Sequence, residues 1–219
     1  MEETVKQWVR EYADDGHRAD LFLDVLPVEE ALAAVERGEF ELAVTGGDPP
    51  DLWFATPIDT DGIAVVVHPT NPIRFFEFSE LGDIFAGRKQ NWELFDGRDR
   101  FIQTVIPPNG DEVRTRFQNS VLGFAPHTPT ALLGPYPSAV AAIVSTEDAA
   151  VGYMPASQVP DHVTIVRVNG LLPEPSNLED GRYPLAFSII ATAPDEPTGK
   201  ARDWLVWLQL ELDAGETQE

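Results

Sequence analysis

The stretch from Gly62 to His68, Gly-Ile-Ala-Val-Val-Val-His, constrains the fold more than any other part of this sequence. It is almost entirely apolar and rich in β-branched residues, which favour extended backbone. A strand with one exposed face alternates apolar and polar residues, whereas a strand covered on both faces shows a continuous apolar run. The segment therefore predicts a central strand of an α/β fold with helices on both sides of the sheet.

Helical and extended patterns alternate along the rest of the chain. Apolar residues recur at helical spacing in residues 4–14, 28–37, 79–87, 111–121, 137–145 and 199–212, with Ser79 as the expected N-cap of the third helix. Strands are predicted at residues 21–26, 40–44, 62–68, 101–106, 149–154, 163–168 and 183–192, with a shorter extended piece at 53–57. The opening order of helix, strand, helix and strand favours parallel strands joined by helical crossovers.

Charge and missing motifs exclude several classes of function. The formal net charge of -22 disfavours binding to nucleic acid and to anionic membrane surfaces. Cysteine is absent, so a disulfide, a thiolate metal site and a cysteine nucleophile are excluded. The histidines at 17, 68, 127 and 162 lack metal-binding spacing and are expected in loops or at the surface, and no phosphate-loop, dinucleotide or serine-hydrolase motif occurs. We therefore expect a binding protein without a cofactor or metal, and not an enzyme.

The chain contains no membrane-spanning pattern and no recognisable leader. No apolar run reaches the length of about 18 residues that a transmembrane helix needs. The first residues, Met-Glu-Glu-Thr, lack the basic start and apolar stretch of a signal peptide. Either the protein is cytoplasmic, or its leader is not part of this chain.

Five short motifs follow one another between Asp61 and Leu185. They are Asp61–Val67 with Asn71-Pro72; Phe78 through Ile84-Phe85-Ala86-Gly87 to Asn91-Trp92; Ala150-Val151-Gly152-Tyr153; Val168-Asn169-Gly170 with Pro175 and Asn177; and Gly181-Arg182-Tyr183-Pro184-Leu185. In this order the motifs resemble those of the substrate-binding proteins of phosphate ABC transporters. Trp92 and Tyr153 are expected to be packing residues of that scaffold.

The resemblance implies a periplasmic-binding-protein-like fold of type 2, in which two α/β lobes with mixed sheets are joined by two crossover strands. Lobe A would comprise residues 1–66 plus 186–219, and lobe B residues 67–185. The resemblance also implies an oxyanion or another small polar solute as ligand in the cleft between the lobes, membrane subunits of an ABC transporter as partners, and an extracytoplasmic location.

The same resemblance suggests where a ligand would bind. Members of the family hold their anion with a loop after the first strand, a second loop in lobe A, and the start of a lobe B helix, where free N–H groups and the helix dipole attract negative charge. The first element is missing from this chain, which would leave an unpaired sheet edge in lobe A that favours self-association. The other two map onto Thr45, Gly46, Gly47, Asp48, Asn109, Gly110, Asp111 and Arg114. An ordinary turn is the alternative interpretation of residues 45–48.

The helix start departs from the family pattern. Asp111, Glu112 and Val113 occupy the positions of a Ser-Gly-Thr sequence, and a carboxylate there can cap its own helix but repels an oxyanion. Residues 106–108, Ile-Pro-Pro, replace a basic residue, and Arg114 either swings back to the cleft or is a surface arginine. The alternative hypothesis is therefore a degenerate module that serves as a sensor or protein-interaction domain without binding phosphate.

Overall fold

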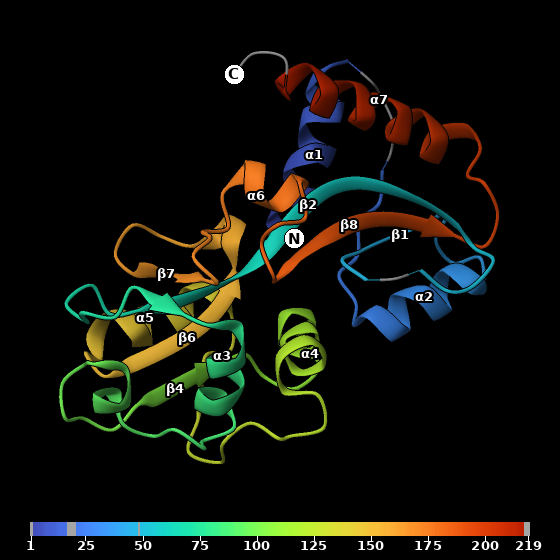
Figure 1. The fold of residues 1–219 in the computed structure, drawn as a ribbon. Helices are drawn as coiled ribbons and strands as arrows, with labels where there is room; N and C mark the ends of the chain where they lie inside the picture. The colour runs from blue at the N-terminus through green and yellow to red at the C-terminus, as the bar shows by residue number, and fades with distance from the viewer. Residues whose placement is uncertain (1, 17–20, 48, 217–219) are drawn as a thin grey trace. The chain divides into compact units, whose positions relative to one another are not determined.

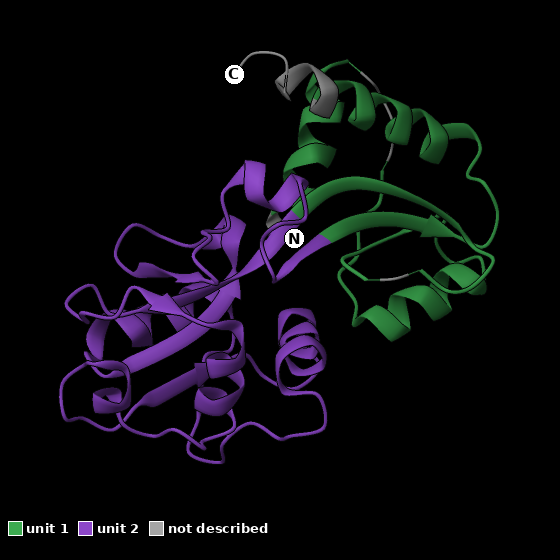
Figure 2. Cartoon of the chain, viewed as in Figure 1, with its two compact units in different colours: residues 1–60, 188–219 green, residues 61–187 purple. Residues whose placement is uncertain are grey.

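The computed structural model describes residues 2–16, 21–47 and 49–216 (Figure 1). The chain divides into two compact units, residues 1–60 with 188–219 and residues 61–187 (Figure 2). These limits lie two to six residues from the predicted lobe limits. Among the described residues, no helix is long and apolar enough to cross a membrane.

The described residues of unit 1 form a small antiparallel sheet and three helices. Its elements are α1 (Glu2–Asp14), α2 (Val28–Glu36), β1 (Ala43–Thr45), the first half of β2 (Phe54–Val67), most of β8 (Ala186–Ala193) and α7 (Gly199–Glu216). The strands lie in the order β1-β8-β2, and β1 runs antiparallel to β8. Helices α1 and α7 lie side by side, with the rings of Tyr12 and Trp207 5.1 Å apart (Figure 1).

Unit 2 contains a larger mixed sheet. Its strands are the second half of β2, β3 (Phe75–Phe76), β4 (Gln103–Ile106), β5 (Leu132–Leu133), β6 (Ala150–Pro155) and β7 (Thr164–Val168). Strand β6 pairs antiparallel with β2 and parallel with β4, which in turn pairs parallel with β5. The helices are α3 (Phe78–Phe85), α4 (Glu112–Phe117), which continues as a π-helix over Gln118–Leu122, α5 (Pro137–Thr146) and α6 (Pro175–Glu179). Single 3-10 turns span Trp92–Phe95 and Ala156–Gln158.

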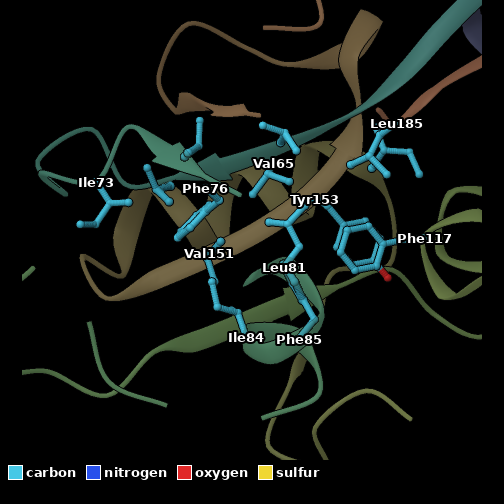
Figure 3. Close-up of a cluster of buried hydrophobic side chains, with 14 of the residues drawn as sticks. Val65, Ile73, Phe76, Leu81, Ile84, Phe85, Phe117, Val151, Tyr153 and Leu185 are labelled. Atoms are coloured by element: carbon cyan, nitrogen blue, oxygen red, sulfur yellow. The ribbon is translucent and has the colours of Figure 1, made fainter. Parts of the chain in front are cut away.

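The two faces of β2 confirm that this strand is buried on both sides. Val65 and Val67 belong to the hydrophobic cluster that α3 and α4 cover (Figure 3), whereas Ala64 and Val66 face the cluster formed with α5. All four residues are fully buried. Because successive side chains of a strand point to opposite faces, a continuous apolar run is what such a position requires.

Several residues of the motifs that resemble those of phosphate-binding proteins pack the interior of unit 2. A Cβ on Gly152 would lie 2.9 Å from Cγ1 of Val140, so only glycine lets α5 approach β6 this closely. Gly87 ends α3 with a φ of 73°. Trp92 is buried, as expected, and its indole N–H donates to the carbonyl oxygen of Ala149 at 2.9 Å. These residues support the fold of unit 2 and form no hydrogen bond or ring contact with the candidate ligand-binding residues that the structure describes.

Three local predictions were wrong. Residues 21–26 form no strand, so the parallel pair expected at the start of the chain does not form among the described residues. An extended segment becomes a strand only where a neighbour takes up its backbone hydrogen bonds. Residues 53–57 and 62–68 belong mostly to one continuous strand, β2. Helix α3 begins after Glu77 and not after Ser79, because the Glu80 carboxylate accepts the N–H of Glu77 at 3.0 Å.

Candidate functional site

The start of α4 in unit 2 carries half of the candidate ligand-binding residues. Strand β4 ends at Ile106, and the turn that follows contains the exposed residues Asn109 and Gly110. Asp111 is the N-cap of α4: its carboxylate accepts the backbone N–H of Arg114 at 3.0 Å. The expected capping by Asp111 is therefore confirmed, and one of the free donors of the helix start is already taken.

Arg114 turns back toward the beginning of its helix. Its side chain is half-buried, and its Nη1 donates to the carbonyl oxygen of Pro107 at 2.9 Å. No carboxylate of the described residues forms an ion pair with this guanidinium. The positive charge of Arg114 therefore lies at the Pro107 turn, where the sequence itself has no basic residue.

Arg116 behaves differently from Arg114, although both belong to α4. Its guanidinium lies 3.4 Å from the carboxylate of Glu112 and 4.5 Å from the ring centre of Phe187. The charge of Arg116 is therefore balanced locally by a carboxylate and an aromatic face. Of the two arginines, only Arg114 directs its guanidinium toward the turn that precedes the helix.

An aromatic stack holds α4 against the sheet (Figure 3). Phe117, the last residue of α4, is fully buried and lies parallel to the ring of Tyr153 at a centroid distance of 4.0 Å. Phe85 from α3 meets both rings edge-on, at 4.8 and 5.2 Å. The packing role expected for Tyr153 is confirmed. Because this stack fixes the end of a short helix, it also fixes the position of Arg114 and Asp111 at its start.

His127 contacts the aromatic stack, which the sequence did not reveal. It lies in a loop, but it is half-buried and its Nε2 is 3.0 Å from the hydroxyl of Tyr153. Burial lowers the pKa of His127 to about 4, and the positive charge of Arg114 acts in the same direction. Burial raises the pKa of Tyr153 well above its ordinary value. Both groups are therefore uncharged near neutral pH.

The remaining candidates belong to unit 1. Thr45 ends β1 and is buried, with Gly46 buried beside it and Gly47 half-buried. Asp48 lies outside the described residues. Thr45 pairs with Ile190 of β8, so its backbone is fixed by the sheet. The structure thus assigns the predicted site residues to two groups, one at the end of β1 and one at the start of α4.

The neutral His127 is expected to make the protein less stable in weak acid. Its pKa is about 4 in the folded protein and 6.5 when unperturbed, so between these values the unfolded state binds more protons. Stability should be complete above the higher value and fall as the pH drops through this window, by on the order of 1 kcal/mol because the ring is half-exposed and screened.

Urea unfolding at about pH 7 and about pH 5 tests this expectation. The substitution His127→Gln should reduce the difference in stability between the two pH values, whereas His162→Gln at an exposed position should not. Equal acid sensitivity of the wild-type protein and His127→Gln would contradict the role assigned to the ring.

Comparison with known proteins identifies the family and the fold of this chain. Residues 24–211 match the model of a family described as a PBP superfamily domain. The phosphate-binding protein PstS of Bacillus subtilis (strain 168) is 28% identical over 151 residues, which are 68% of this chain and 50% of that protein. The chain therefore spans about half the length of the curated relative it matches.

Solved structures show the same fold. An ABC-type phosphate transport receptor from Vibrio cholerae superposes with a TM-score of 0.83 at 18% identity, covering 97% of this chain and 91% of the other. A protein described as a phosphate ABC transporter substrate-binding protein, from Clostridium perfringens and with bound phosphate, gives 0.82 at 20% identity over 93% and 86% of the chains.

Proposed function

Because the chain belongs to the family of PBP superfamily domains, we propose that it is a solute-binding protein of the ABC-transporter type. Its fold is the α/β fold of type 2 periplasmic-binding-protein-like proteins, with mixed sheets. The ligand that we propose is an oxyanion or another small polar solute. The names of the relatives support this proposal, since the relatives reported above are phosphate-binding or phosphate-transport proteins.

The position of the Arg114 guanidinium is the observation that carries this proposal. A guanidinium has five N–H donors, and the carbonyl of Pro107 accepts one of them. The planar, positively charged group matches the geometry of an oxyanion. It lies beside the start of a helix, where the backbone dipole also favours negative charge. Arg114 would therefore supply the positive charge that the turn at residues 106–108 lacks.

The Asp111 carboxylate weakens such a site without abolishing it. Its negative charge lies at the same helix start, so it opposes a dianion more strongly than a monoanion or a neutral solute. Asn109, Gly110 and Asp111 would contact the ligand from the turn and the cap of α4. From the resemblance alone, Thr45, Gly46, Gly47 and Asp48 are proposed as a second group of ligand-binding residues in unit 1, which offers a hydroxyl group, backbone N–H groups and a carboxylate acceptor.

We also propose that the protein binds its solute without transforming it, outside the cytoplasm and together with membrane subunits of a transporter. The relatives reported above are named as binding proteins or transport receptors and not as enzymes. Assembly with the transmembrane subunits can be tested by pull-down from detergent extracts, with the solute present and absent.

Calorimetric titration with phosphate, sulfate, molybdate and small carboxylates tests the proposed ligand class. Heat of binding and a rise in melting temperature with at least one of these anions are expected, since a ligand that binds only the folded state stabilises it. The absence of both signals for every anion would contradict the proposal and support the alternative, a module of this fold that recognises a protein partner.

A further inference from the structure

The turn between β4 and α4 contains an asparagine followed by a glycine, Asn109 and Gly110. Both residues are exposed, and Gly110 has a φ of 85°. A Cβ placed on Gly110 would meet no atom within 4 Å, so open space surrounds this part of the backbone. Within the described part of the chain, neither the Asn109 side chain nor the Gly110 N–H forms a hydrogen bond. The asparagine side chain is therefore free to approach the backbone nitrogen that follows it.

This arrangement favours an intramolecular reaction of the side-chain amide. The Gly110 nitrogen attacks Cγ of Asn109, and glycine favours the attack because it has no Cβ to obstruct it. A bond forms between this nitrogen and Cγ, the bond from Cγ to Nδ2 breaks, and ammonia leaves with the proton of the Gly110 N–H. Water then opens the five-membered imide at either carbonyl, which gives aspartate or isoaspartate. Both products carry a negative carboxylate where asparagine has a neutral amide.

We propose that Asn109 is a site of spontaneous deamidation, and that the new carboxylate lowers anion affinity at the start of α4 as the protein ages. The second part rests on the proposed function. Asp111 already places one negative charge at this helix start, and Arg114 supplies one positive charge. A carboxylate two residues before Asp111 would make the balance negative and repel an anionic ligand. Isoaspartate would also lengthen the backbone of the turn by one carbon atom.

A second asparagine–glycine pair of the same unit, Asn169 and Gly170, is equally exposed but is held in place. Oδ1 of Asn169 accepts the backbone N–H of Phe78 at 2.8 Å, and the backbone N–H of Asn169 donates to the carbonyl oxygen of Phe76 at 3.0 Å. The first hydrogen bond fixes the side chain and the second fixes the backbone, so both oppose the attack. Asn169 should therefore deamidate more slowly than Asn109 by about tenfold or more.

Peptide mapping by mass spectrometry tests the modification on the whole protein. After incubation in mildly alkaline buffer, the peptide that contains Asn109 should show the mass gain of deamidation, and the peptide that contains Asn169 should show it at a rate at least about tenfold lower. Asn109→Gln should abolish the fast reaction, because the same attack on glutamine needs a larger, six-membered ring. This variant should leave the rate at Asn169 unchanged.

Incubation in urea shows whether the folded structure causes the difference between the two sites. Asparagine precedes glycine at both, so the rates at Asn109 and Asn169 should become similar once unfolding removes the hydrogen bonds of Asn169. Equal rates in the folded protein, or no reaction at Asn109, would overturn the proposed modification site. These measurements do not depend on anion binding, so they leave the proposed solute-binding function untouched.

Calorimetric titration with phosphate tests the effect on affinity. Asn109→Asp reproduces the aspartate product and should weaken phosphate binding by about threefold or more. Asn169→Asp adds the same charge in the turn after β7 and keeps an acceptor for the N–H of Phe78, so it should leave the affinity unchanged. Equal affinities of the two variants would overturn the effect. A wild-type protein that binds no anion would overturn both the proposed function and this effect, whereas the mass measurement decides the modification separately.

Discussion

Replacing Phe117 by alanine is expected to lower the free energy of unfolding by about 3–5 kcal/mol. The ring is fully buried between Tyr153 and Phe85, so the substitution removes a stacked pair, an edge-on contact and the apolar area of the whole side chain. Because α4 and the π-helix that continues it together span only residues 112–122, packing against the sheet is needed to hold their position. The variant should therefore lose stability and also the alignment of Asp111 and Arg114.

Urea unfolding followed by tryptophan fluorescence measures the first effect, and anion titration of the folded variant measures the second. Phe124→Ala is the matched control, because Phe124 is fully exposed on the loop that follows the π-helix. The control should unfold at the same urea concentration as the wild-type protein. A Phe117→Ala variant that is within about 1 kcal/mol of the wild-type stability would contradict the role of the stack.

Opposite changes at Arg114 and Asp111 are expected to move anion affinity in opposite directions. Arg114→Gln should weaken phosphate binding by roughly tenfold to a hundredfold, because hydrogen bonds to charged groups contribute about 1.5–3 kcal/mol. Asp111→Ser should strengthen it, because serine retains the N-cap of α4 while the negative charge disappears. The stability of Asp111→Ser should therefore remain close to that of the wild-type protein.

Calorimetric titration of the three proteins with phosphate, under the same salt concentration, measures these effects. Arg98→Gln serves as the control for the loss of a positive charge, since Arg98 is an exposed arginine of the same unit beside Asn71 and Trp92. If Arg98→Gln weakens binding as much as Arg114→Gln, the effect is one of net charge only. If Asp111→Ser does not bind phosphate more tightly, the start of α4 does not contact the anion.

The sequence correctly predicted the elements whose residue pattern lies within one short segment of the chain. The run from Gly62 to Val67 indicated a doubly covered strand, because each residue of such a strand faces an apolar layer. The helix predicted over residues 79–87 ends there, because Gly87 has a φ of 73°, which favours glycine. The strand predicted at residues 21–26 does not form. A strand needs a neighbouring strand to pair with, and the composition of the segment does not show whether one is present.

The candidate site also contains one feature that the sequence predicted and one that it did not. The sequence placed Asp111 at a helix start, and the cap that it forms spans only three residues. It could not show that His127 meets Tyr153, because 26 residues separate them and no spacing rule links the two. The histidine was therefore expected in a loop or at the surface, and only its burial showed that it remains neutral beside Arg114.

The sequence by itself determined the α/β class and the family, because apolar periodicity and glycines at close contacts are properties of short segments. The tertiary structure decided which charge faces the turn before α4. Two arginines lie two residues apart on this helix, and only the packing around them directs Arg114 to Pro107 and Arg116 to Glu112 and Phe187. The direction of a long, flexible side chain depends on contacts made by residues distant in sequence, so no local pattern encodes it.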